Sequence, residues 1–155
     1  MNPEKFQNLI SQVTSQISGK PLDKELEAFL NEEFPASGEL FKYIESACHQ
    51  GVADGWVCDR EHGGIKFGRV IKPSDAIHGF SVDVVEMNNI VGPHHAHPNG
   101  EIDMIMPLDG DARFDGQGKG WLVYPPGSAH KPTVSGGSAF VLYLLPNGAI
   151  EFSRA

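Results

Sequence analysis

The sequence has few cysteines and few basic residues, and both shortages exclude classes of protein. Its two cysteines, Cys48 and Cys58, are too few for a disulfide framework, and their separation does not suggest a metal knuckle. Both are expected to be reduced and packed in the interior, where free cysteine is common. Lys and Arg number 12 against 20 Asp and Glu, which gives a net charge of −8. Because binding to a phosphate backbone depends on clustered basic residues, nucleic acid is not expected as a partner.

The sequence also lacks long apolar runs and a targeting signal. No stretch approaches the ~20 apolar residues that a membrane-spanning helix needs, so no membrane partner is expected. The start of the chain has neither the basic residues nor the apolar core of a secretory signal, and we therefore expect a cytoplasmic protein. A chain of 155 residues fits one domain, over 1–155, because domains commonly have about 100 to 150 residues.

The first third of the chain has the spacing of amphipathic helices. Apolar residues recur every three or four positions over 3–17, which predicts a helix there. A second helix is expected from Pro21, which suits the first helical position, to the Phe-Pro pair that breaks it. A third is expected to start at Ser37, whose hydroxyl can cap it, and to end at Gly51 or Gly55.

Beyond residue 54 the pattern changes to short runs of Val, Ile and Phe separated by turn-forming residues, which is typical of strands. The chain has 18 Gly and 11 Pro, which is consistent with many turns. The expected strands span 56–58, 65–71, 79–87, 90–97, 101–107, 111–114, 121–124, 139–145 and 149–152. Together the patterns predict a mainly β fold, in which a helical segment over 1–54 precedes a barrel or sandwich over 55–155.

Histidines are concentrated at one place in the predicted β region. Side chains two residues apart on a strand share one face, so His95 and His97 can reach the same ion at the ~2.0 to 2.1 Å that imidazole ligation requires. The turn at 98–100 then brings Glu101 beside them as an oxygen ligand, which gives a set of two histidines and one carboxylate. His94 has the opposite strand parity and is expected to point away.

A fourth ligand is expected from the next turn. His130 follows the rigid turn at Pro125 and Gly127, where a new strand can return across the mouth of a barrel. The order His95-x-His97 with Glu101, then Pro125-x-Gly127-x-x-His130, resembles the two metal motifs of the cupin superfamily. This resemblance implies a cupin (jelly-roll) β-barrel and a divalent metal ion. Histidine and carboxylate ligands suit Zn, Fe, Mn or Ni, and the sequence does not choose among them.

The identity of the carboxylate ligand has two candidates. In a typical cupin six residues separate the glutamate from a glycine, whereas here eight separate Glu101 from Gly110 and six separate Asp103 from Gly110. Asp103 shares the strand face of Glu101, so it is either the ligand or an acid/base group beside the metal. We favour Glu101 as the ligand and consider both carboxylates candidate catalytic residues.

A narrower resemblance covers nearly the whole chain. It is carried by the runs GIKFGRVIKP (64–73), HGFSVDVVEM (78–87) and IDMIMPLDGDARF (102–114), and it extends to NEEFP (31–35) and GWVC (55–58). These runs resemble the 4-hydroxylaminobenzoate lyase family. The resemblance implies conversion of 4-hydroxylaminobenzoate and water to 3,4-dihydroxybenzoate (protocatechuate) and ammonia, a step in the degradation of nitroaromatic compounds.

Such a reaction is redox-neutral, which agrees with a chain that has no Gly-x-Gly-x-x-Gly nucleotide motif. Its small aromatic carboxylate substrate requires a cation in the pocket, for which Arg69, Lys72 and Arg113 are candidates. A homodimer is expected by analogy, because cupins are commonly dimers. Two alternatives stay open: an Fe(II)-dependent cupin dioxygenase for a small aromatic or organic acid, and a ligand-binding cupin without enzymatic activity.

Overall fold

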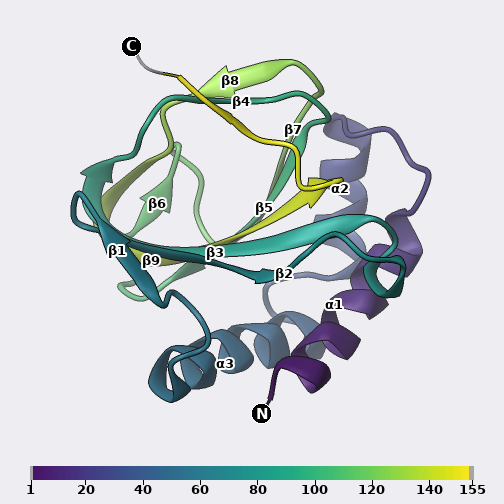
Figure 1. Cartoon of the computed structure of the whole chain (residues 1–155), viewed down its shortest axis with the longest axis horizontal. Helices are drawn as coiled ribbons and strands as arrows, with labels where there is room; N and C mark the ends of the chain where they lie inside the picture. The colour runs from purple at the N-terminus through teal and green to yellow at the C-terminus, as the bar shows by residue number, and fades with distance from the viewer. Residues whose placement is uncertain (1, 154–155) are drawn as a thin grey trace.

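The computed structural model describes residues 2–153 and shows helices on one side of two β-sheets (Figure 1). The helices are α1 (Pro3–Ile17), α2 (Lys24–Glu33) and α3 (Glu39–Asp54), with a short 3-10 helix, η1 (Asp75–Ile77), between β2 and β3. The strands are β1 (Arg60–His62), β2 (Ile65–Ile71), β3 (Phe80–Val91), β4 (His95–His97), β5 (Glu101–Pro107), β6 (Arg113–Phe114), β7 (Gly120–Tyr124), β8 (Ser128–His130), β9 (Thr133–Pro146) and β10 (Glu151–Phe152). No helix among these residues is long and apolar enough to cross a membrane.

The strands form a jelly-roll-like pair of antiparallel sheets, as expected for a cupin, although the sheets do not close into a barrel. The large sheet has seven strands in the order β1-β2-β3-β9-β5-β7, with β6 paired to β9. The small sheet has the order β10-β4-β8 and lies at the top of Figure 1. The helices lie on the opposite side of the large sheet and at its β7 edge.

The second helix begins later than the sequence predicts. Pro21 is not its first residue, because α2 starts at Lys24. The Asp23 carboxylate accepts a hydrogen bond from the Leu26 backbone N–H at 2.9 Å. Such a cap stabilises a helix by about 1 kcal/mol, so it decides where the helix starts.

The third helix also begins differently. Ser37 is not its cap, because Gly38 occupies that position and makes no side-chain cap hydrogen bond. The Gly38 N–H instead donates to the Pro35 carbonyl at 2.8 Å in a tight turn that precedes the helix. The helix ends as predicted, because Gly55 adopts a left-handed φ of 83° that favours glycine.

Several predicted strands have different bounds in the structure. Residues 56–58 are a bend rather than a strand, and the predicted strand over 90–97 is interrupted between β3 and β4. The prediction missed β1 and β8, which are only three residues long. Strand β9 begins earlier than expected, and it bulges between its pairings with Asn88 and Ile90 of β3, where Gly136 has a φ of 76°. A Cβ on Gly136 would meet the Asp111 carbonyl oxygen, so this bulge requires glycine.

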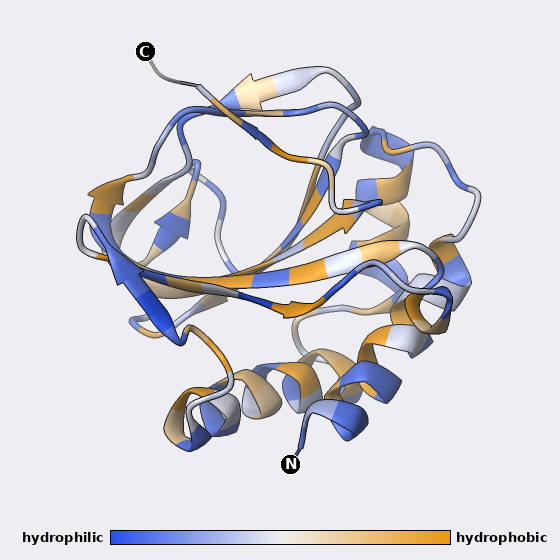
Figure 2. Cartoon of the chain, viewed as in Figure 1, coloured by the Kyte–Doolittle hydropathy of each residue, from blue (hydrophilic) through white to orange (hydrophobic). Residues whose placement is uncertain are grey.

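Both faces of the large sheet are buried at its centre, so residues 101–106 of β5 and 139–145 of β9 are buried without interruption. One face packs on the helices, and Val84, Met104 and Leu142 belong to that core. The other face looks into the jelly roll, and Ile105 and Val141 belong to its core. Figure 2 shows apolar residues along the sheet and recurring on each helix. Full burial of one large apolar side chain contributes roughly 1.5 to 3 kcal/mol, so this packing, more than capping, holds the helices in place.

Helix α2 covers the exposed edge of the large sheet. The Asn31 side chain accepts a hydrogen bond from the Trp121 backbone N–H at 2.9 Å and donates to the Trp121 carbonyl at 3.0 Å. The Val123 N–H donates to the Glu27 carboxylate at 2.9 Å. These side chains replace the neighbouring strand that β7 lacks and satisfy its unpaired backbone groups. The helix therefore supports the strand beside the first residues of β5.

Candidate metal centre

The four residues predicted as metal ligands lie together where the small sheet meets the large sheet. The ligand atoms of His95, His97, Glu101 and His130 all lie within 4.8 Å of one another. Strand pairing explains the assembly, because β4 pairs with β8 and places His95 directly opposite His130. Glu101 is brought back by the turn at Gly100, whose φ is 89° and where a Cβ would lie 2.9 Å from the Tyr124 carbonyl oxygen. The turn therefore requires glycine.

The distances within this cluster match ligation of a single ion. Oε1 of Glu101 lies 3.3 Å from His95 Nε2 and 3.2 Å from His97 Nε2. The His130 Nε2 atom lies 3.5 Å from Oε2 of Glu101 and 3.1 Å from His95 Nε2. Two donors that each lie about 2.1 Å from one ion, at angles between square and tetrahedral, are separated by roughly 3.0 to 3.4 Å.

Outer hydrogen bonds aim each imidazole at the centre of the cluster. The Nδ1 partners are the Pro93 carbonyl for His95 at 3.3 Å, the Ser128 hydroxyl for His97 at 2.9 Å and the Asp115 carboxylate for His130 at 2.6 Å. A carbonyl and a carboxylate only accept, and the Ser128 hydroxyl already donates to the Pro125 carbonyl at 2.6 Å. Each Nδ1 therefore carries the proton, and each Nε2 can present a lone pair inward, the arrangement of metal-binding histidines.

The cluster leaves buried polar atoms without partners. Within residues 2–153, His97 Nε2 and Glu101 Oε2 make no hydrogen bond, although both side chains are fully buried. Burying polar groups in this way is costly unless something satisfies them. A divalent cation would satisfy both atoms and offset the carboxylate charge. The donor set, its spacing and its unpartnered atoms therefore all fit a divalent metal.

Asp115 is an outer partner that the sequence prediction missed. Its carboxylate accepts hydrogen bonds from His130 at 2.6 Å, from the Tyr124 hydroxyl at 2.5 Å and from the Thr133 N–H at 2.9 Å. Burial raises the pKa of the Asp115 carboxyl, but these bonds outweigh burial and lower that pKa below its ordinary value. For His130, burial disfavours the charged form, but the bonds to Asp115 and Glu101 raise its pKa to about 9.

The two candidate carboxylates occupy different positions. Glu101 is in the ligand cluster, whereas Asp103 is outside it, fully buried, with neither oxygen hydrogen-bonded within the described chain. Burial raises the pKa of Glu101, but the close contacts with His130, His95 and His97 outweigh burial and hold this pKa well below its ordinary value. Burial, together with the adjacent Glu101 charge, raises the pKa of Asp103 well above its ordinary value. Of this pair of carboxyls, Asp103 therefore holds a proton more readily than Glu101. His94 is also outside the cluster, as its parity predicts.

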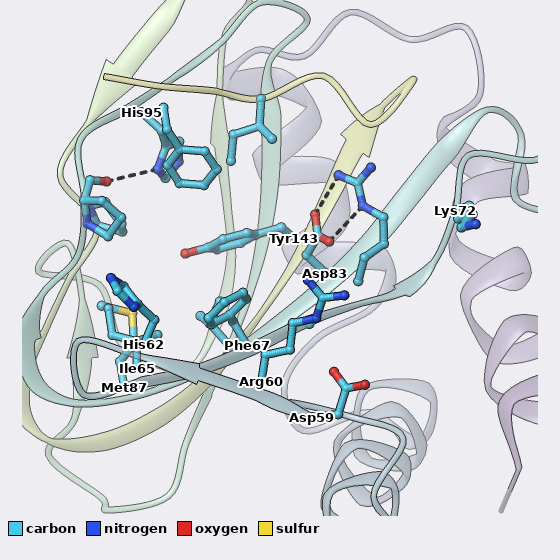
Figure 3. A pocket seen from close by; sticks show the side chains of 17 residues that line it. Asp59, Arg60, His62, Ile65, Phe67, Lys72, Asp83, Met87, His95 and Tyr143 are labelled. Atoms are coloured by element: carbon cyan, nitrogen blue, oxygen red, sulfur yellow. Dashed lines mark hydrogen bonds and ion pairs between the residues drawn. The ribbon is translucent and has the colours of Figure 1, made fainter. Parts of the chain in front are cut away.

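A cavity of about 630 Å³ opens beside the cluster, and His95 belongs to both (Figure 3). Its walls are mainly apolar and are formed by Ile65, Phe67, Val85, Met87, Pro93, Pro132, Tyr143, Ile150 and Phe152. Phe152, from the terminal strand β10, also packs on the His95 ring, with the ring centroids 5.6 Å apart. The cavity therefore offers a mainly apolar space next to the candidate metal centre.

The predicted substrate-binding cations are not equivalent in the structure. Arg69 lines the cavity, but its guanidinium pairs with the Asp83 carboxylate through contacts of 2.9 and 3.1 Å. Lys72 also lines the cavity, whereas Arg113 lies on β6 and is not part of the lining. Arg60 lines it too, and the prediction missed this residue because the short strand β1 has no recognisable pattern. Of the cavity cations within 2–153, Arg60 and Lys72 form no ion pair.

Comparisons with known proteins give a consistent result. A family model described as "PnbB: 4-hydroxylaminobenzoate lyase" matches residues 8–152. A 4-hydroxylaminobenzoate lyase from Nocardioides sp. (strain LMS-CY) is 30% identical over 147 residues, which cover 89% of this chain and 87% of that protein. The 4-hydroxylaminobenzoate lyase of Pseudomonas putida is 30% identical over 155 residues, which cover 89% and 88%.

Solved structures with a similar arrangement include cupins of low sequence identity. An RmlC-like cupin protein from Ralstonia eutropha is 12% identical, with a TM-score of 0.44 over 58% of this chain and 60% of that one. Oxalate oxidase in complex with glycolate is 20% identical, with a TM-score of 0.45 over 59% of this chain and 56% of that one. The polyketide cyclase RemF from Streptomyces resistomycificus is 20% identical, with a TM-score of 0.44 over 60% and 73%.

Proposed function

Because the chain belongs to the 4-hydroxylaminobenzoate lyase family, we propose that it converts 4-hydroxylaminobenzoate and water to 3,4-dihydroxybenzoate and ammonia. We propose further that a divalent metal ion, held by His95, His97, Glu101 and His130, is required. One observation carries the proposal: His95 belongs both to the ligand cluster and to the lining of the apolar cavity. An ion in the cluster would therefore adjoin an aromatic molecule bound in the cavity.

The cavity suits a small aromatic acid. Its volume of about 630 Å³ is within the range of about 300 to 1,000 Å³ that is usual for small-molecule sites. In Figure 3, Lys72 lies across the view from His95, and Arg60 lies below both of them. We assign the substrate carboxylate to Arg60 or Lys72, because Arg69 is already paired with Asp83. This orientation directs the hydroxylamino group toward His95.

The proposed reaction balances without an oxidant or reductant. The N–O bond breaks and its oxygen leaves as water after taking up a proton, while a water molecule adds to the adjacent ring carbon. A second water hydrolyses the resulting imine, which releases ammonia and leaves the catechol after loss of the ring proton. Two waters enter and one leaves. A bound divalent ion supplies Lewis acidity at the hydroxylamino end.

The residues of the chain contribute binding, exclusion of water and control of charge. The apolar walls limit the access of bulk water, which strengthens electrostatic interactions at the reacting group. Asp103, whose pKa is raised by burial and by the adjacent Glu101, can hold a proton close to the cluster. We propose Glu101 as a ligand and Asp103 as a group that assists proton transfer.

An anaerobic isotope experiment tests the proposal. The metal-analysed protein is incubated with 4-hydroxylaminobenzoate in ¹⁸O-labelled water without O₂, and ammonia and catechol are measured together. The expected result is equal amounts of both, with solvent label in both ring hydroxyls, because one water adds to the ring carbon, a second hydrolyses the imine, and water is the only oxygen donor in a redox-neutral route. Activity that requires O₂ and places label from ¹⁸O₂ in the product would instead establish a cupin dioxygenase and refute the lyase proposal.

A further inference from the structure

Tyr143 lies where the cavity meets the candidate metal centre. It is on β9, lines the cavity, and has a side chain that is 5% exposed. Strand register places Asp103 of β5 on one side of it and Asp83 of β3 on the other. Its ring centroid lies 6.3 Å from that of His95. Of the two tyrosines near the cluster, Tyr143 is the one that faces the cavity.

The Tyr143 hydroxyl has no hydrogen-bond partner among residues 2–153, although the side chain is almost completely buried. The Tyr124 hydroxyl, by contrast, donates to Asp115 at 2.5 Å. Figure 3 shows the Tyr143 ring reaching into the cavity with its oxygen toward the open space. The hydroxyl opens into the cavity, so this donor is available to a molecule bound there.

The electrostatic surroundings keep this group a donor. Burial, followed by the charges of Glu101 and Asp103, raises the pKa of the Tyr143 phenol well above its ordinary value. The phenol therefore retains its proton at neutral pH. Its contribution to a ligand is a hydrogen bond from a neutral O–H, with no proton transfer.

Building on the proposed function, we infer that Tyr143 is a substrate-contacting residue that donates a hydrogen bond to the oxygen of the hydroxylamino group. The inference rests on its place beside His95, its open hydroxyl and the apolar wall that continues from it along the cavity. A donor aimed at this oxygen stabilises the negative charge that develops as the N–O bond breaks. It also selects ring substituents that carry a hydroxyl one atom away from the ring.

Two unreactive probes isolate this hydrogen bond. In 4-(hydroxymethyl)benzoate the substituent has the shape of the hydroxylamino group and keeps its hydroxyl, whereas 4-ethylbenzoate has the same shape without oxygen. Calorimetry measures the affinity of each probe for metal-loaded wild-type protein, for Tyr143→Phe and for Tyr43→Phe. Tyr43 is a matched control because it is 57% exposed on α3. Metal content and the thermal midpoint of each protein are measured alongside.

The wild type should prefer the hydroxymethyl probe by about fivefold, the usual worth of one neutral hydrogen bond. Tyr143→Phe should abolish this preference and leave the affinity for 4-ethylbenzoate within about twofold, with unchanged metal content. Tyr43→Phe should behave as the wild type. The inference is overturned if Tyr143→Phe keeps the preference or if the wild type has none. It is also overturned if Tyr143→Phe unfolds, because the hydroxyl would then have a structural role.

These readouts do not depend on turnover, so the two proposals fail separately. If the preference depends on Tyr143 but the anaerobic assay releases no ammonia, the lyase proposal is wrong and the contact stands. If ammonia is released and the preference is independent of Tyr143, only the contact is wrong.

Discussion

Replacing Asp115 by asparagine tests whether the outer hydrogen bonds prepare the metal centre. The Asp115 carboxylate accepts hydrogen bonds from His130, Tyr124 and the Thr133 N–H, and its side chain is only 14% exposed. Asparagine keeps the shape and can still accept from Thr133, but its NH₂ group then faces two donors. His130 therefore loses its charged partner and the contact that fixes its tautomer.

Two estimates, one from the hydrogen bond and one from metal affinity, agree on the size of the expected loss in metal binding. A hydrogen bond to a charged group contributes about 1.5 to 3 kcal/mol, and the His130–Asp115 contact of 2.6 Å is of that kind. Loss of an outer partner of a metal ligand typically lowers metal affinity by about 10- to 100-fold, which corresponds to about 1.4 to 2.7 kcal/mol. We therefore expect Asp115→Asn to lower metal affinity by about 10- to 100-fold.

Competition with a chromogenic chelator at constant pH measures this affinity. Asp111→Asn is a suitable control, because it removes the same charge from an exposed position in the same region. Tyr124→Phe removes one of the three bonds to Asp115 and should have a smaller effect than Asp115→Asn. Unchanged affinity in Asp115→Asn, with an intact circular dichroism spectrum, would show that Asp115 does not prepare His130 for metal binding.

Three further predictions concern the ligands themselves. His97→Ala should lose most of its metal, whereas His94→Ala, which changes a histidine outside the cluster, should keep it. Equal metal content of the two variants by elemental analysis would contradict the proposed site. Glu101→Gln should lose metal, whereas Asp103→Asn should keep its metal and turn over substrate about 10- to 100-fold more slowly. Metal loss in Asp103→Asn but not in Glu101→Gln would make Asp103 the carboxylate ligand. Because the pKa of His130 is raised to about 9, metal binding must displace its proton, so apparent affinity should increase from about pH 6 to about pH 9. Affinity that is independent of pH over this range would contradict that competition.

The parts of the site that depend on local geometry could be predicted from the amino-acid sequence. His95 and His97 share a face because strand side chains alternate, and Gly100 turns the chain so that Glu101 follows beside them. The apolar spacing likewise determined α1, whose bounds agree with the predicted range over 3–17. These features are set by residues a few positions apart, so a pattern in the sequence is enough to reveal them.

Strand pairing decided the rest, because it joins residues that are distant in the chain. Tyr143 lies beside Asp103 only because β9 pairs with β5, and Arg60 reaches the cavity through a three-residue edge strand with no pattern of its own. Pairing of β2 with β3 likewise places Arg69 opposite Asp83, with which it forms an ion pair. Basic and aromatic side chains have many possible partners in a sequence, and only the register of the sheet determines which of them face the cavity and which are already satisfied.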